Sequence, residues 1–233
     1  MKFIYPKEYL EQRADEINRK FYPERLIKII KLDVYDLLEK LGLDVEWKYI
    51  SPNDDILGMI FFEDGCWYIW PNSDFKEEDK PRKEYFKKNT IVINQRLLDK
   101  NEVEREMFVC NHETMHSVKD KAFFRSRDIK ELHICRENDF SKTYWYEGMS
   151  LLDIVERQTN YLNAAVLMPR DIIKQEFFKR LRYKNIPNQP IEYKKYMSKC
   201  IKSLAADFGL NYNPVLYRLY DLNILKRKED IQS

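Results

Sequence analysis

Glycine and long apolar runs are both scarce in this chain. It has five glycines in 233 residues, and no stretch resembles the glycine-rich loops that hold phosphates. The longest uninterrupted apolar stretches, such as residues 59–62, are a handful of residues long, whereas a membrane-spanning helix needs roughly 20. The sequence therefore argues against a phosphate-loop nucleotide-binding protein and against a protein that spans a membrane.

Cysteine is also rare, and its spacing does not suggest disulfides. Cys66, Cys110, Cys135 and Cys200 are scattered through the chain, unlike the dense cysteines of small secreted domains. The first residues lack the apolar core of a secretory signal peptide. We therefore expect a cytoplasmic protein.

Apolar and charged residues are both plentiful. Hydrophobic residues make up 44% of the chain and aromatic residues 14%, which is enough to bury a core and excludes a disordered protein. The net charge of +2 is divided unevenly, since residues 1–169 carry −5 and residues 170–233 carry +7. The basic C-terminal part favours a polyanion or an acidic partner, although such a charge is also typical of an ordinary solvated surface.

The N-terminal part of the sequence predicts two helices followed by short strands. Asp33 is the expected N-cap of the second helix and Gly42 its end. An Asp-Gly turn between two apolar runs predicts a β-hairpin. The expected elements are helices at 7–20 and 34–41, a strand at 45–49, a hairpin of 57–62 and 67–70, a loop at 71–83 and a strand at 90–94.

Helices dominate the rest of the sequence. Asn101 with Glu104, and Ser150 with Asp153, have the spacing of capping boxes, which predicts helices at 102–119 and from 151 to just before Pro169. Three more helical stretches are expected at 171–183, at 192–208 and after Asn213-Pro214. These patterns predict an α+β domain at 1–175 and a helical extension at 176–233.

The residues with the clearest chemistry are His112-Glu113-Thr114-Met115-His116. On a helix, histidines four residues apart lie about 40° apart in azimuth and one turn apart in height, so that both imidazoles can reach one metal ion. The glutamate between them can address a metal-bound water without binding the metal. The pattern is typical of zinc metallopeptidases, the alternative being two histidines that share a helix face by chance.

A catalytic zinc ion needs a third protein ligand, and the helix after Ser150 offers one. Glu156, Thr159, Asn160 and Asn163 form a polar stripe opposite apolar residues of the same helix. If the stripe faces inward, Glu156 is the expected ligand, and its neighbours would orient it. If the stripe faces solvent, it has no such role; Asp153 and Glu147 are weaker candidates.

Other residues leave alternatives open. His133 and Cys135, with Cys110 and the two histidines of the motif, could form a closed and non-catalytic zinc site. A tetrahedral oxyanion could receive a hydrogen bond from His133, Tyr161, Asn160 or another tyrosine at 144 or 146, and any of His133, Tyr161 and Asn160 could instead orient a metal ligand.

These motifs resemble the ImmA/IrrE family of metallo-endopeptidases. The resemblance covers roughly residues 30–175 and rests on a strand ending in Ile93-Asn94, the His112–His116 motif, the run from Glu156 to Ala164, and Leu167-Met168-Pro169. It implies a zincin-like fold, zinc held by His112, His116 and Glu156, Glu113 as the catalytic base, and a protein substrate, commonly a helix-turn-helix repressor. The chain departs from the family at Thr114-Met115, where Leu or Ile and Gly are usual, at Thr159 instead of Ala, and in a longer segment at 117–149.

The C-terminal part suggests a second activity. Ala205 and Gly209, followed by a turn and another helix, are similar to a helix-turn-helix, and Lys226-Arg227-Lys228 follow. The alternative hypothesis is therefore a non-catalytic, zinc-stabilised regulator that binds DNA. Simple packing of this helix pair on the rest of the protein would explain the same residues.

Overall fold

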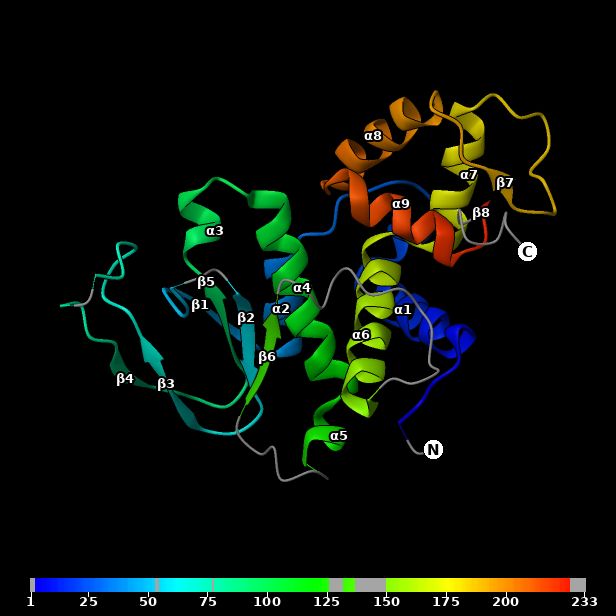
Figure 1. Ribbon diagram of the computed structural model, residues 1–233. Helices are drawn as coiled ribbons and strands as arrows, with labels where there is room; N and C mark the ends of the chain where they lie inside the picture. Colours follow the sequence, from blue (N-terminus) through cyan, green and yellow to red (C-terminus); the bar gives the residue numbers. More distant parts are fainter. Residues whose placement is uncertain (1–2, 53–54, 77, 126–131, 137–149, 227–233) are drawn as a thin grey trace. The chain divides into compact units, whose positions relative to one another are not determined.

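A computed structural model describes residues 3–52, 55–76, 78–125, 132–136 and 150–226, and for 132–136 it describes the backbone alone (Figure 1). It combines helices with small sheets, which confirms the α+β prediction. The described helices are α1 (Lys7–Phe21), the 3₁₀ turn η1 (Pro23–Leu26), α2 (Val34–Leu41), α3 (Arg96–Asp99), α4 (Val103–Lys119), α5 (Lys121–Arg125), α6 (Leu151–Leu167), α7 (Arg170–Arg180), α8 (Met197–Phe208) and α9 (Tyr212–Asp221). The described strands are β1 (Asp44–Lys48), β2 (Ile56–Phe61), β3 (Gly65–Ile69), β4 (Arg82–Phe86), β5 (Thr90–Asn94), β6 (Leu132–Arg136), β7 (Ile191–Glu192) and β8 (Leu225–Lys226).

The chain folds into two compact units, each assembled from two separate stretches of sequence. The first unit contains residues 1–4 and 33–160, and the second contains residues 5–32 and 161–233. α6 begins in the first unit and ends in the second, because the division falls between Asn160 and Tyr161. The expected boundary between residues 175 and 176 lies inside α7 of the second unit.

A four-stranded sheet with the order β1-β5-β2-β6 is the base of the first unit. β5 runs parallel to β1 and antiparallel to β2, and β2 is also antiparallel to β6. Every residue of β2 and β5 is buried, because both faces of these central strands are covered. Among the described strands, β6 forms one edge of this sheet.

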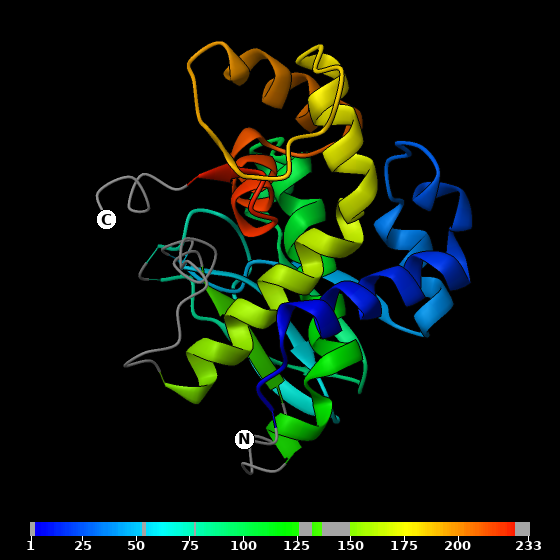
Figure 2. The same ribbon diagram turned by 90° about the vertical axis from the view of Figure 1, so that its right-hand side faces the viewer.

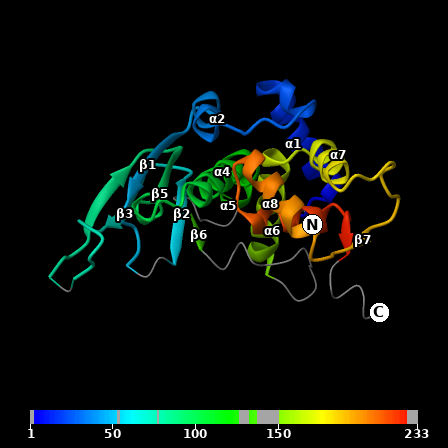
Figure 3. The ribbon, with the colours of Figure 1, turned by 90° about the horizontal axis from the view of Figure 1, so that it is seen from above.

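The two faces of the sheet are covered by different elements (Figure 3). On one face α4 approaches β2 closely at Gly58, where a Cβ atom would lie 2.9 Å from Cγ1 of Val109 and 3.2 Å from Cγ of Glu113. On the other face β3 and β4 form an antiparallel hairpin whose inward side chains join the apolar core. That core contains Ile50, Ile56, Met59, Phe61, Ile69, Phe86 and Val92, with Trp67 packed against it.

Two helix caps in the first unit follow the sequence prediction. The side chain of Asp33 accepts bonds from the first backbone amides of α2, and Gly42 ends this helix with a φ of 68°. Oγ of Ser150 accepts a bond from the amide of Asp153 at 3.1 Å at the start of α6. Both predictions are confirmed. The sequence could predict these caps because each depends only on neighbouring residues.

Two other local predictions are wrong. The runs at 57–62 and 67–70 do not pair with each other, since β2 joins the large sheet and β3 pairs with β4. β2 is buried on both sides and therefore belongs at the centre of a sheet, whereas β3 is only partly buried. Asn101 does not cap α4: the N-cap is Glu102, without a side-chain bond, and Asn101 has a φ of 55°. The sequence also did not predict β6.

In the second unit a buried arginine caps the end of α6. Arg25 donates to the carbonyl oxygens of Val166 and Leu167 at 2.9 and 2.8 Å, and to that of Ile30 at 2.9 Å. The last carbonyls of a helix have no partner within it and carry partial negative charge, so a cation there is favourable. Burial lowers the pKa of Arg25 to about 10, which leaves it charged at neutral pH.

A second buried arginine joins the two ends of the chain. Arg218 of α9 forms a bidentate pair with Glu11 of α1, with N–O distances of 2.6 and 2.9 Å. It also donates to the carbonyl of Met168 at 3.2 Å, directly after α6. The hydroxyl of Tyr161 donates to the same Glu11 carboxylate at 2.6 Å. The network therefore ties α1, α6 and α9 together inside this unit.

The second unit also contains the predicted C-terminal helix pair. α8 ends at Gly209, which has a φ of 67°, and α9 follows after a short turn (Figure 2). β7 and β8 pair in parallel beside α7. Of the described helices, none has the length and apolar content needed to cross a membrane.

Candidate metal centre

α4 carries the motif histidines in its most deeply buried stretch. Every residue from 109 to 116 is buried, and His112, Glu113 and His116 are 0% exposed. Polar side chains are rarely buried so completely unless they have partners or a function. The helix therefore places its chemical groups inside the first unit instead of on its surface.

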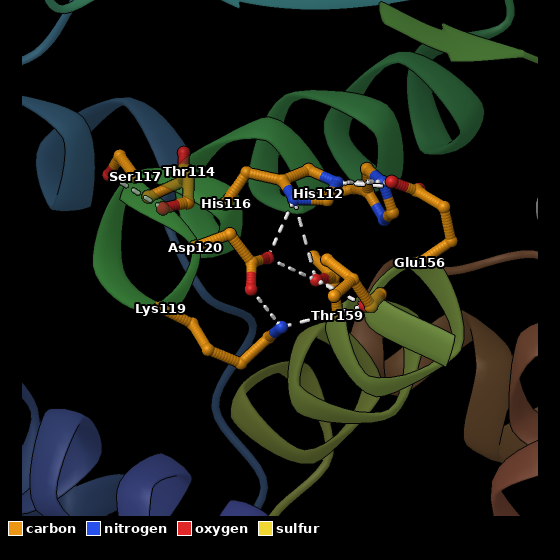
Figure 4. A network of polar contacts seen from close by, with 9 residues as sticks. His112, Thr114, His116, Ser117, Lys119, Asp120, Glu156 and Thr159 are labelled. Atoms are coloured by element: carbon orange, nitrogen blue, oxygen red, sulfur yellow. Dashed lines mark hydrogen bonds and ion pairs between the residues drawn. The ribbon is translucent and has the colours of Figure 1, made fainter. Parts of the chain in front are cut away.

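Three Lewis-base atoms from α4 and α6 meet at one point. Nε2 of His112 and Nε2 of His116 lie 2.9 Å apart. Oε2 of Glu156 lies 3.4 Å from each of them. Figure 4 shows this meeting point on the side of the His116 ring that faces away from Asp120. The arrangement confirms that the two helices bring His112, His116 and Glu156 together as a group able to hold a metal ion.

The spacing of these atoms suits a tetrahedral ion. With bonds of about 2.0–2.1 Å to nitrogen and oxygen, the ligand atoms around such an ion lie about 3.3 Å apart. The three observed separations fall close to that value. Among the described residues the group has three such side chains, the number that catalytic zinc sites use when they keep a fourth position for water or substrate. The donor set and its geometry therefore both fit a bound metal ion.

The polar stripe on α6 faces inward. Glu156 is 3% exposed, and Thr159 and Asn163 are 0% exposed, so the alternative of a solvated face is wrong for these residues. Asn160 is partly buried. Val155, Leu162 and Val166 on the apolar side are buried as well, which explains why periodicity alone could not identify the side that carries the metal-binding group.

Carboxylates on both sides of His116 control its protonation. Burial alone would lower the pKa of His116, but the Glu156 and Asp120 carboxylates outweigh it and raise that pKa to about 10. Nδ1 of His116 lies 2.8 Å from Oδ2 of Asp120. Without a metal, the His116 ring is therefore protonated on both nitrogens near neutral pH, and a metal ion must displace the proton on Nε2.

Glu113 follows His112 in α4 and is directed toward β2. Its Cγ lies 3.2 Å from the position that a Cβ of Gly58 would occupy. Any larger residue at 58 would crowd both this carboxylate and the helix that carries the histidines. The need for glycine at position 58 was not predicted from the sequence, because the contact depends on the packing of α4 on the sheet.

The remaining predicted site residues either lie outside the metal-binding group or belong to parts of the chain whose side chains the structure does not describe. The hydroxyl of Tyr161 contacts Glu11 in the second unit. Cys110 is buried in α4, and among the described residues it does not belong to the metal-binding group. Asp153 lies in the first turn of α6, where its amide donates to Oγ of Ser150 and its carboxylate accepts a bond from the same hydroxyl. His133 and Cys135 have described backbone only, and residues 144, 146 and 147 lie outside the described part of the chain.

Sequence reasoning also missed two polar residues that follow the motif. Asp120 contacts His116 from four residues further along the chain, a spacing that places it on the same side of the helix. Lys119 forms an ion pair with Asp120. The i, i+4 spacing from His116 was the available signal, and it could have identified Asp120.

Comparisons with known proteins add no identification. No protein-family model matches the sequence, and no match was found among curated proteins.

Proposed function

We propose that this chain is a zinc-dependent endopeptidase of zincin-like fold, similar to the ImmA/IrrE family and acting in the cytoplasm. Its substrate would be a protein, such as a helix-turn-helix repressor. The observation that carries the proposal is the convergence of His112, His116 and Glu156 at separations of 2.9–3.4 Å, with Glu113 in the same helical turn. These residues offer three candidate metal ligands and a carboxylate that can serve as a base, which would meet the two requirements of metal-assisted peptide hydrolysis.

In this mechanism, zinc would supply Lewis acidity toward a water molecule and the substrate carbonyl. Glu113 accepts the proton of the attacking water on its carboxylate and later delivers it to the amine that leaves. The buried surroundings of Glu113 exclude bulk water, which strengthens its electrostatic interaction with reacting groups. The backbone of the edge strand β6 offers a place where an extended substrate could add as a further strand.

The first test separates metal binding from catalysis. Glu113→Gln should keep one zinc per chain and the fold, yet lose cleavage by about 10²–10⁴-fold, the contribution of general acid–base catalysis. Glu156→Gln should lose zinc, measured by elemental analysis of the purified protein. Cleavage would be followed with repressors encoded beside the gene for this chain as candidate substrates. Unchanged turnover in Glu113→Gln would contradict the assigned base.

Glu106→Gln is a matched control for these variants. Glu106 is also a buried glutamate of α4, but it accepts bonds from Tyr35 and Trp47. Burial raises the pKa of its carboxyl group. A neutral amide at this position can still accept from both donors, so zinc content and cleavage should stay near those of the unmodified protein. A loss equal to that of Glu113→Gln would indicate general damage to α4.

A regulator that binds nucleic acid is the second candidate function. It is supported by the α8–α9 pair around Gly209 and by Lys199 and Lys202, which are exposed on α8. Arg227 and Lys228 lie outside the described residues. This function requires an affinity for duplex DNA that falls with salt and on replacement of the basic residues. Salt-independent or absent binding would leave the helix pair with a packing role.

A further inference from the structure

A buried carboxylate lies directly behind the candidate metal site. Oδ2 of Asp120 lies 2.8 Å from Nδ1 of His116 and accepts a bond from Oγ1 of Thr159 at 2.7 Å. Its other oxygen pairs with Lys119. The side chains of Asp120 and Lys119 are only 3% and 5% exposed (Figure 4). One carboxylate therefore contacts a metal ligand, a hydroxyl and an ammonium group at once.

Stability alone is a poor explanation for this cluster. Removing two charges from water is costly, and a buried ion pair is often no more favourable than apolar residues of the same volume. Apolar side chains at 119 and 120 would also fill the space behind the histidine. The arrangement is better explained by what the carboxylate does to the ring that it contacts.

Asp120 determines which nitrogen of His116 carries a proton. A carboxylate at hydrogen-bond distance from Nδ1 accepts a hydrogen bond from the N–H group there, so the lone pair of the neutral ring lies on Nε2. Nε2 is the atom that lies 2.9 Å from Nε2 of His112 and 3.4 Å from the Glu156 carboxylate. The bond therefore presents the nitrogen that a metal ion would need, in the orientation that it would need.

The same cluster also connects the two helices that carry the ligands. Asp120 and Lys119 follow the histidines at the end of α4, whereas Thr159 and the carbonyl of Val155, 3.5 Å from Nζ of Lys119, belong to α6. Val155 and Thr159 lie on either side of Glu156 along the chain. These contacts fix the distance and rotation of α6 at the turn that presents the Glu156 ligand.

We propose that Asp120 is a positioning residue of the metal site, which, together with Lys119 and Thr159, holds His116 and Glu156 in a metal-ready arrangement before the ion binds. This inference rests on the ligand set of the proposed function, but not on peptide hydrolysis. The hydrogen bond from Thr159 to Asp120 bridges α6 and α4. This bridge explains why the chain has Thr at position 159, because the alanine usual at the resembling position in the ImmA/IrrE family cannot make the bond.

The test measures metal affinity on the full chain. Zinc dissociation constants would be measured at pH 7 by competition with a chromophoric chelator. Once each affinity is corrected for the protons that zinc displaces, Asp120→Asn should weaken zinc binding to the neutral ring by about 10–100-fold, the effect of removing a partner of a metal-bound histidine. Asp36→Asn is the matched control: it also removes a carboxylate paired with a lysine, Lys40, but at the surface of the same unit. It should leave zinc affinity unchanged.

Thr159 offers a second pair of variants, which change a single hydroxyl group and no charge. Thr159→Val keeps the shape of the side chain and removes the hydroxyl, so it should weaken zinc binding by a smaller factor than Asp120→Asn. Thr159→Ser restores the hydroxyl and should recover most of the affinity. Cobalt(II) spectra of the same proteins report ligand geometry, and the bands should shift in Asp120→Asn and Thr159→Val but not in Asp36→Asn. If Asp120→Asn does not fold, the comparison of Val with Ser at 159 decides the question.

The outcomes distinguish this inference from the proposed function. Normal zinc affinity and an unchanged cobalt spectrum in Asp120→Asn would overturn the positioning role, even if the protein cleaves peptides. Equal affinity of Thr159→Val and Thr159→Ser would do the same for the bridge. A wild-type chain that binds no zinc would overturn both the inference and the peptidase proposal.

Discussion

The two units each bury a polar cluster, and the two clusters are built in opposite ways. In the second unit, the Arg218 cation and the Glu11 anion face each other in a bidentate pair at 2.6 and 2.9 Å. In the first unit, two imidazole nitrogens and a carboxylate oxygen converge at 2.9–3.4 Å, and all three can act as Lewis bases. In the Arg218–Glu11 cluster of the second unit, the two protein charges neutralise each other. The cluster of the first unit instead suits an added cation.

Because of this difference, we expect substitutions in the two clusters to affect different properties. Arg218 and Glu11 join α9 to α1, the two ends of the chain, so their loss should affect folding first. His112, His116 and Glu156 bring together only one turn each of α4 and α6, and the contacts of Asp120 hold those turns from behind. Their loss should affect ligand binding first. Substitutions in one cluster should therefore leave the property of the other intact.

The largest effect is expected from breaking the buried pair of the second unit. Arg218→Met should lower the free energy of unfolding by about 3–5 kcal/mol, because it leaves the Glu11 charge buried without its cation. Zinc binding at the first unit should persist wherever the protein is folded. Urea denaturation, followed by hydrogen exchange to locate the unfolded region, measures the loss. The double change Glu11→Leu with Arg218→Met should recover much of it, since no lone charge then stays buried.

Arg13→Met is the control for that experiment. Arg13 pairs with Glu16 in the same unit, but both side chains are 38% exposed, so the pair should contribute about 0–1 kcal/mol. Equal losses in the free energy of unfolding for Arg13→Met and Arg218→Met would contradict the division of roles between the two clusters. So would a loss of zinc binding when the second unit unfolds in Arg218→Met.

The central part of the site could be predicted from the sequence because it is local. His112 and His116 lie one turn apart on one helix, and the helix was predicted at nearly its observed bounds, although the capping box from which it was predicted does not form. The inward direction of Glu156 could not be derived from periodicity, since α6 is buried on its apolar and polar sides alike. The same spacing of four residues could have identified Asp120, which follows His116 by one helical turn. Lys119 and Thr159 acquire their roles only through the packing of α4 against α6.

The sheet shows the same limit. Apolar residues predicted strands at 57–62 and 90–94, and both exist, but their partners depend on long-range pairing. The Asp-Gly turn predicted the wrong hairpin because β2 pairs with β5 and β6, whereas β3 pairs with β4. Gly58 could be recognised as a required glycine only once α4 was known to cross it.

A smaller effect, on the first unit, is expected from filling the space at Gly58. Gly58→Ala places a Cβ 2.9 Å from Cγ1 of Val109 and 3.2 Å from Cγ of Glu113, so α4 or these side chains must move. Overpacking of this kind costs typically about 1–3 kcal/mol. Cleavage should fall more than zinc affinity, because the added methyl group contacts the proposed base and not a metal ligand. Thermal unfolding, zinc titration and turnover measure the three effects.

A second substitution makes that result specific. Val109→Ala removes the atom in closest contact, so Gly58→Ala with Val109→Ala should be less destabilised than the sum of the single variants. Additive losses would show that the effect of Gly58→Ala has another origin, such as the conformation of β2. The second unit should not respond to any of these changes, since neither residue belongs to it.

The smallest effect is a pH dependence that only the first cluster should show. Burial lowers the pKa of His116, but the Glu156 and Asp120 carboxylates raise it to about 10, above the ordinary value of 6.5. In the metal-free protein, the resulting stabilisation is therefore present below about pH 6.5 and is lost as the pH rises through about 10. Zinc must displace this proton, so its apparent affinity should increase about tenfold, or 1.4 kcal/mol, per pH unit between pH 7 and 9.

Calorimetry in buffers of different ionisation enthalpy would count the protons that zinc releases. One proton per zinc at pH 8 is expected for His116, whereas a histidine with the ordinary pKa would already be neutral and would release almost none. The second cluster provides the contrast: although burial opposes its charge, Arg218 lowers the pKa of Glu11, and Glu11 raises that of Arg218, so neither titrates in this range. Zinc binding without proton release at pH 8 would show that His116 is not held between two charged carboxylates, and the contrast between the clusters would then lose its electrostatic basis.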